Sequence, residues 1–259
     1  MAREIDGKLR VASDHWGDFR FSVATGKVLG LEDVAVYGFN NDINGTLEDV
    51  WQTGGLFPYP TSEQTLTIVS SSANDEATNV GVREVRVEYL DGDFNTQIVD
   101  VEMDGTNSVQ VATDFFRLQG AYATQVGANA DAEGAITLAY SGNTVGTIVA
   151  GSNEVKSSIY TVPAGYTAYI VGANISAAKN DDLAFYLRYR NANQTNAPFI
   201  TASQLDTYQS GMYFDLPTYY AVPEKYDIRI SAISFQGGNT KAAVTYHMIL
   251  RNNKDYANN

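Results

Sequence analysis

The sequence contains no cysteine among its 259 residues. Disulfides, thiolate metal sites, iron–sulfur clusters and cysteine nucleophiles are therefore excluded. Histidine is nearly absent as well, because His15 and His247 are the only two, and neither has an acidic residue or a second histidine at a motif spacing. Histidine is the usual general base and a common metal ligand. We therefore expect no catalytic residues, no metal site and no cofactor.

Basic residues are also few, since 17 Lys and Arg stand against 30 Asp and Glu and give a formal net charge of −13. Nucleic-acid binding depends on Lys and Arg displacing counterions from phosphates, so this class of partner is disfavoured. No apolar run approaches the ~20 residues that a membrane-spanning helix needs, and the first eight residues lack the apolar stretch of a signal peptide. We expect a protein made in the cytoplasm, with no membrane partner.

Apolar residues alternate with polar ones along most of the chain, which is typical of strands with one buried face. Residues 85–89 and 99–103 alternate in this way, and Asp, Gly and Asn between them favour a tight turn, so we predict a hairpin. No stretch predicts a helix of ordinary length. Further alternating runs lie at residues 136–140, 183–189, 228–232 and 244–250. The pattern predicts an all-β protein with antiparallel sheets.

The acidic residues are unevenly distributed, because residues 45–151 hold 15 of them against 3 basic residues. With turn residues around Gly151, this asymmetry predicts two antiparallel β-sandwich, jelly-roll-like domains. The acidic domain would span residues 45–151 and a tyrosine-rich domain residues 152–259. Residues 1–44 would form an extended N-terminal arm for attachment, so that removing residues 1–40 leaves a folded remainder. The alternative is that the aromatic residues of this segment close one end of the first sandwich.

Asp91, Asp93 and Asn95, followed by Glu102, have the spacing of a calcium-binding loop. The position that must turn sharply is Thr96 instead of glycine, and the following residues already alternate as a strand, so an EF-hand is rejected. A looser calcium site at Asp91 and Asp93 remains open. The favoured interpretation is an acidic hairpin turn.

Tyrosine is abundant, with 17 residues that lie mostly after residue 151. A tyrosine side chain buries a large area and keeps a hydroxyl for a partner, which suits subunit interfaces and also sugar-stacking surfaces. Half of these residues are expected in the core. The candidate interface residues are Trp16, Phe19, Phe21, Tyr37, Tyr208, Tyr213, Tyr219 and Tyr220.

Four segments carry a recognisable pattern: residues 47–60 (LEDVWQTGGLFPYP), 69–75 (VSSSAND), 160–169 (YTVPAGYTAY) and 222–228 (VPEKYDI). In order and spacing they resemble a group of tailed-phage virion structural proteins that is common in marine phages. Pro163, Ala164 and Gly165 in the third segment suit a tight turn. We also expect Trp51 to be buried beneath the first sandwich.

The resemblance implies a virion building block without catalytic activity. The favoured hypothesis is a capsid accessory protein (cement, decoration, knob or head fibre) on the particle exterior. It would dock on the major capsid protein or other virion proteins as a symmetric homo-oligomer, with a trimer expected. One alternative is a tail or baseplate adhesion module that binds host surface glycans. The other is a glycan hydrolase or lyase, whose carboxylate pair would have to come from residues far apart in the sequence.

Overall fold

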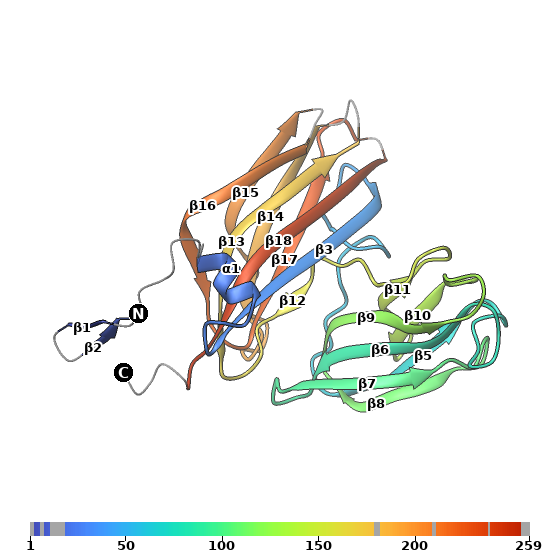
Figure 1. Ribbon diagram of the computed structural model, residues 1–259. Helices are drawn as coiled ribbons and strands as arrows, with labels where there is room; N and C mark the ends of the chain where they lie inside the picture. Colours follow the sequence, from blue (N-terminus) through green and yellow to red (C-terminus); the bar gives the residue numbers. More distant parts are fainter. Residues whose placement is uncertain are drawn as a thin grey trace.

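The computed structural model describes residues 3–5, 8–10, 19–178, 182–208, 211–237 and 239–254. In this part of the chain every regular element except one short helix is a strand, and the sheets are antiparallel, so the predicted all-β class is confirmed (Figure 1). No helix among the described residues is long and apolar enough to cross a membrane. The first elements are β1 (Arg3–Ile5), β2 (Lys8–Arg10), α1 (Phe19–Ala24), β3 (Leu31–Ile43) and β4 (Glu48–Asp49).

Strands β5 to β11 form one lobe, which we call the inserted lobe. They are β5 (Gln64–Ser70), β6 (Val82–Leu90), β7 (Thr96–Glu102), β8 (Val109–Phe115), β9 (Arg117–Val126), β10 (Ile136–Tyr140) and β11 (Asn143–Ile148). Their sheet orders are β11-β10-β5-β8 and β7-β6-β9, and side chains from both sheets share one hydrophobic core. The predicted hairpin is confirmed, because Val87 on β6 pairs with Val99 on β7. Trp51 belongs to this core and is 3% exposed, as predicted.

The remaining strands form the flanking lobe together with β3 and β4. They are β12 (Tyr160–Thr161), β13 (Tyr166–Ala177), β14 (Asp182–Asn191), β15 (Ile200–Tyr208), β16 (Gly211–Val222), β17 (Tyr226–Ser234) and β18 (Thr240–Asn252). One sheet has the order β16-β13-β18-β3 and the other β12-β17-β14-β15, with β4 also paired to β17. A second core, which includes the fully buried Tyr246, lies between these two sheets. The predicted turn at Pro163–Gly165 joins β12 to β13, and Gly165 has a φ of 81°.

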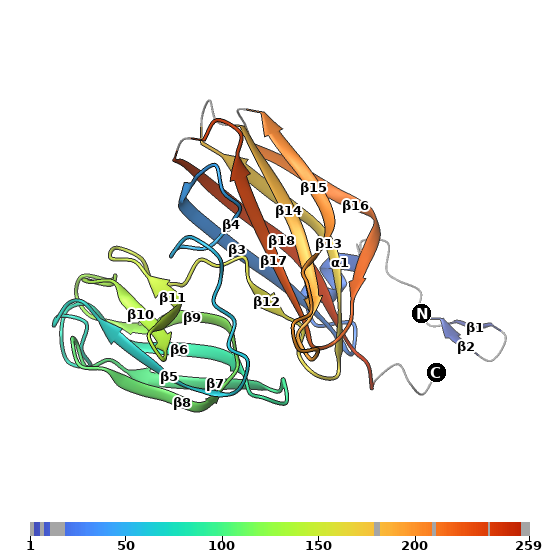
Figure 2. The same cartoon turned by 180° about the vertical axis from the view of Figure 1, so that it is seen from behind.

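The strand pairing corrects the predicted domain boundaries. Residues 31–43 are not part of an extended arm, because β3 pairs along the length of β18, from Leu31 opposite Arg251 to Ile43 opposite Thr240. Strand β4 pairs with β17 in the same way. The flanking lobe is therefore discontinuous in sequence, and the other lobe is inserted into it (Figures 1 and 2). Removing residues 1–40 would take away most of a sheet strand.

A buried ion-pair network joins the two lobes. Asp227 on β17 is fully buried and accepts hydrogen bonds from Arg117 Nε of β9 at 2.8 Å and from Arg190 Nε of β14 at 2.8 Å. Thr161 Oγ1 donates to the same carboxylate at 2.7 Å. Because an unpaired buried charge is strongly destabilising, these contacts fix the inserted lobe against the flanking lobe.

A second buried carboxylate, Asp49 of β4, lies opposite Ser231 further along β17. Asp49 Oδ2 accepts from Arg229 Nη1 at 2.9 Å, and the backbone N–H of Phe57 donates to Asp49 at 2.8 Å. The Phe199 ring lies 3.7 Å from the Arg229 guanidinium and 4.5 Å from that of Arg190. The chain that leaves β4 for the inserted lobe is thus held to the flanking lobe at its first residues.

Candidate functional site

Two surfaces collect the residues that could contact a partner, and the first lies around α1. Val23 of this helix packs on Val171 and Ile249, so α1 covers the outer face of the sheet that contains β13 and β18. Its Phe19 and Phe21 side chains point outward and are 48% and 56% exposed. The helix therefore presents two phenyl rings to solvent above this sheet.

Strand β16 adds polar aromatic groups beside the helix. Arg20 Nη1 lies 3.1 Å from Asp215 Oδ1, and the Tyr213 hydroxyl donates to the same oxygen at 2.6 Å. These hydrogen bonds, first that of Tyr213 and then that of Arg20, lower the pKa of Asp215 below its ordinary value. Tyr219 also contacts the Arg20 side chain by a hydrogen bond. We call the surface formed by Phe19, Phe21, Tyr213 and Tyr219 the helix–β16 face.

The other predicted interface residues lie elsewhere. Trp16 is outside the described residues, and for Tyr208 the structure describes only the backbone, at the end of β15. Tyr220 is partly buried against the flanking core, with its ring 5.5 Å from that of Tyr189. Tyr37 on β3 is 40% exposed and faces a cleft between the lobes. Four of the eight predicted residues thus lie together, and their role at an interface stays a prediction.

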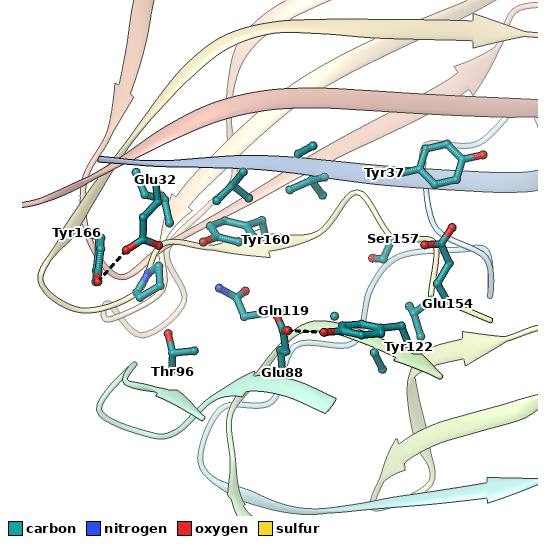
Figure 3. A pocket seen from close by; sticks show the side chains of 18 residues that line it. Glu32, Tyr37, Glu88, Thr96, Gln119, Tyr122, Glu154, Ser157, Tyr160 and Tyr166 are labelled. Atoms are coloured by element: carbon teal, nitrogen blue, oxygen red, sulfur yellow. Dashed lines mark hydrogen bonds between the residues drawn. The ribbon is translucent and has the colours of Figure 1, made fainter. Parts of the chain in front are cut away.

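The second surface is this inter-lobe cleft, a hollow of about 530 Å³ between β3 on one side and the inserted lobe on the other (Figure 3). Three carboxylates line it: Glu32 from β3, Glu88 from β6 and Glu154 from the chain that returns to the flanking lobe. The described lining residues include no lysine, arginine or histidine. These carboxylates disfavour anionic ligands by charge repulsion.

Tyrosines share the lining with the carboxylates. The Tyr166 hydroxyl lies 3.5 Å from Glu32 Oε1, and the Tyr122 hydroxyl lies 3.5 Å from Glu88 Oε1. Tyr160 is 7% exposed, and its hydroxyl forms no hydrogen bond with any residue that the structure describes. Burial first, and then the charges of Glu32 and Glu88, raise the pKa of Tyr160 above its ordinary value. In Figure 3 this hydroxyl end points along the cleft toward Glu32.

Sequence reasoning missed the cleft, because its residues come from segments that are far apart in the chain. Glu32 lies in the segment assigned to the arm, and Glu88 lies in a strand of the predicted acidic domain. They meet because β3 joins the flanking lobe and the inserted lobe then folds back against it. The one available signal was Tyr160, which opens the third recognised segment without an apparent role.

The segment after β6 has the geometry of an acidic hairpin turn, which is the interpretation favoured by its sequence. Asp91 Oδ1 accepts hydrogen bonds from the backbone N–H groups of Asp93 at 3.0 Å and Asn95 at 2.9 Å, and Gln97 Nε2 donates to Asp91 Oδ2 at 2.9 Å. Burial alone would raise the pKa of Asp91, but these hydrogen bonds lower it. Both oxygens of Asp91 are thus engaged in closing the turn. Among the described residues, no group of three or more potential metal ligands is close enough to hold an ion.

The chain matches no protein-family profile, and no curated protein matches it in sequence. Solved structures give weak similarities. The structure of infectious bursal disease virus Gt strain has 13% identity and a TM-score of 0.25, with 93% of this chain and 79% of that chain covered. The VP2 subviral particle of infectious bursal disease virus has 11% identity and a TM-score of 0.22, with 92% and 79% covered. TM-scores this low do not establish a shared fold.

Proposed function

We propose that this chain is a non-enzymatic structural protein of a tailed-phage virion, and that its flanking lobe is a jelly-roll β-sandwich. The strand order carries the proposal. Strands β4 and β12 pair with successive stretches of β17, Glu48 and Asp49 opposite Ala232 and Ser231, and Tyr160 opposite Ile228. They are two halves of one strand, interrupted by the inserted lobe.

Counted in this way, the flanking lobe has eight strands in chain order. One sheet takes the first, eighth, third and sixth, and the other takes the second, seventh, fourth and fifth. This arrangement is that of a jelly roll, an architecture found in viral capsid domains and also in lectins and cupins. The inserted lobe is then a second, seven-stranded sandwich without that order.

The distribution of charge supports a virion role with one docking end and one projecting end. Residues 45–151, which contain the whole inserted lobe and also β4 of the flanking lobe, hold 15 acidic and 3 basic residues. Copies with so acidic a surface repel one another unless water separates them. We propose that the inserted lobe faces solvent and that the flanking lobe docks on the major capsid protein or another virion protein as a symmetric homo-oligomer.

The helix–β16 face is the proposed docking surface, because exposed aromatic rings are enriched at protein interfaces. Its combined variant Phe19→Ala, Phe21→Ala, Tyr213→Ala and Tyr219→Ala should disappear from purified particles. A matched control replaces two exposed apolar residues that lie outside the helix–β16 face, Leu56→Ala and Ile98→Ala. Each of these side chains is 58% exposed. The control should remain in the particle, as measured by mass spectrometry. Absence of the unaltered protein from particles would refute the proposed function.

The cleft favours a second candidate function, an adhesion module of the tail or baseplate that binds host glycans. Jelly rolls also occur in lectins, so the strand order is compatible with both candidates. Electron microscopy of particles that carry a tag after residue 254 distinguishes them, because the tag would decorate the capsid in one case and the tail in the other.

A further inference from the structure

The inter-lobe cleft presents many hydrogen-bond acceptors and no charged donor. Glu32, Glu88 and Glu154 supply carboxylate oxygens, and the described lining holds no basic side chain to neutralise them. A ligand for this cleft must therefore bring hydrogen-bond donors and carry no negative charge. Its volume of about 530 Å³ lies within the range of small-molecule binding sites.

The Tyr160 hydroxyl can take a hydrogen-bond partner from within the cleft. The Tyr160 side chain is largely buried, but its hydroxyl oxygen is open to the cleft. Tyr160 is 7% exposed and has no hydrogen-bond partner among the described residues, while its hydroxyl end points into the cleft (Figure 3). A ligand group that both donates and accepts would satisfy it, as a sugar hydroxyl does.

Two further tyrosines give the cleft exposed aromatic surface. Tyr37 on β3 and Tyr122 on β9 are 40% and 38% exposed, and they belong to opposite walls of the cleft. Figure 3 shows Glu154 between them. A tyrosine ring offers an apolar face with a polar tip, which suits the CH face and the hydroxyls of a sugar ring.

We infer that the inter-lobe cleft binds a neutral oligosaccharide, with its hydroxyl groups donated to Glu32 and Glu88 and its rings against Tyr37 and Tyr122. A polyol supplies donors for the carboxylates and both kinds of group for Tyr160. A lysine or arginine side chain supplies donors alone and leaves most of the cleft unfilled. This inference does not depend on where the protein sits in the virion, so it can fail while the proposed function holds.

Ligand-observed NMR with the purified full chain tests the inference directly. The probes are maltotriose and the trimer of N-acetylglucosamine as neutral sugars, a hyaluronan tetrasaccharide as an acidic sugar, and tetralysine as a basic peptide. We expect saturation transfer to at least one neutral trimer at millimolar concentration and none to the acidic sugar. Binding of tetralysine without either neutral sugar would overturn the inference and assign the cleft to a basic partner, and absence of binding by both neutral trimers would also overturn it.

Variants locate the bound sugar. Tyr160→Phe removes one hydroxyl and should weaken binding about tenfold, because the ligand loses a hydrogen bond in a partly buried site. Glu88→Gln should weaken binding by a similar factor. The matched control is Tyr213→Phe, which removes a hydroxyl on the helix–β16 face and should leave the affinity unchanged. Equal affinities of Tyr160→Phe and Tyr213→Phe, with unchanged thermal midpoints, would place the sugar outside the cleft and refute the inference.

Discussion

Replacing Asp227 with asparagine tests whether the buried ion-pair network holds the lobes together. The carboxylate is fully buried and neutralises Arg117, whose side chain is 3% exposed, and Arg190, which is 21% exposed. The variant Asp227→Asn keeps the shape and removes the charge, so two guanidinium groups remain without their anion. Breaking a buried pair in this way costs about 3 to 5 kcal/mol. Such a loss is a large fraction of the ~5 to 15 kcal/mol that stabilises a typical protein.

Urea unfolding followed by circular dichroism measures this loss. With a denaturant dependence of ~3 kcal/mol per molar urea, the midpoint should fall by about 1 to 2 M. The matched control is Asp100→Asn, which breaks the pair of Arg86 and Asp100 on the surface, where the side chains are 38% and 39% exposed. Exposed pairs contribute little, so the control should unfold almost like the unaltered protein. Equal midpoints for the two variants would refute the assigned role of Asp227.

Three further predictions concern the flanking lobe. An added methyl group on Gly38 would lie 2.6 Å from the backbone nitrogen of Ser158, so Gly38→Ala should lower the free energy of unfolding by about 1 to 3 kcal/mol. Gly120 has open space around it, so the control Gly120→Ala should leave the free energy of unfolding nearly unchanged. Removing residues 1–30 should leave a folded, soluble species on size-exclusion chromatography, because β3 is kept. Removing the chain through β3 should cause aggregation, and a soluble product of this second truncation would contradict the pairing of β3. Burial raises the pKa of Tyr246 in the folded protein well above the ordinary value of ~10, which it has in the unfolded chain. The stability contributed by its neutral hydroxyl is therefore complete below pH ~10 and is lost as the pH rises through the pKa of the folded state. Phenolate absorbance should therefore rise in two steps, the second together with unfolding, and one step near pH ~10 without unfolding would contradict this.

The sequence by itself determined the class of fold and several local elements. Alternation marked the strands at residues 136–140, 183–189 and 244–250, and the Asp and Asn residues after β6 marked the hairpin turn. These features depend on neighbours within a few residues, because the period of two assigns each side chain to a face and short-range turn chemistry closes the chain.

The tertiary structure alone decided which strands pair and what their pairing brings together. Residues 1–44 show no long regular alternation, and nothing local indicates that residues 31–43 pair with β18 near the other end of the chain, so the prediction of an arm was wrong for these residues. The insertion between β4 and β12, the contact of Arg117 with Asp227 and the meeting of Glu32 with Tyr160 at the cleft likewise join residues that are far apart in the sequence. Their physical cause is the burial of two separate cores, which is a property of the whole chain and is not present in any short segment of it.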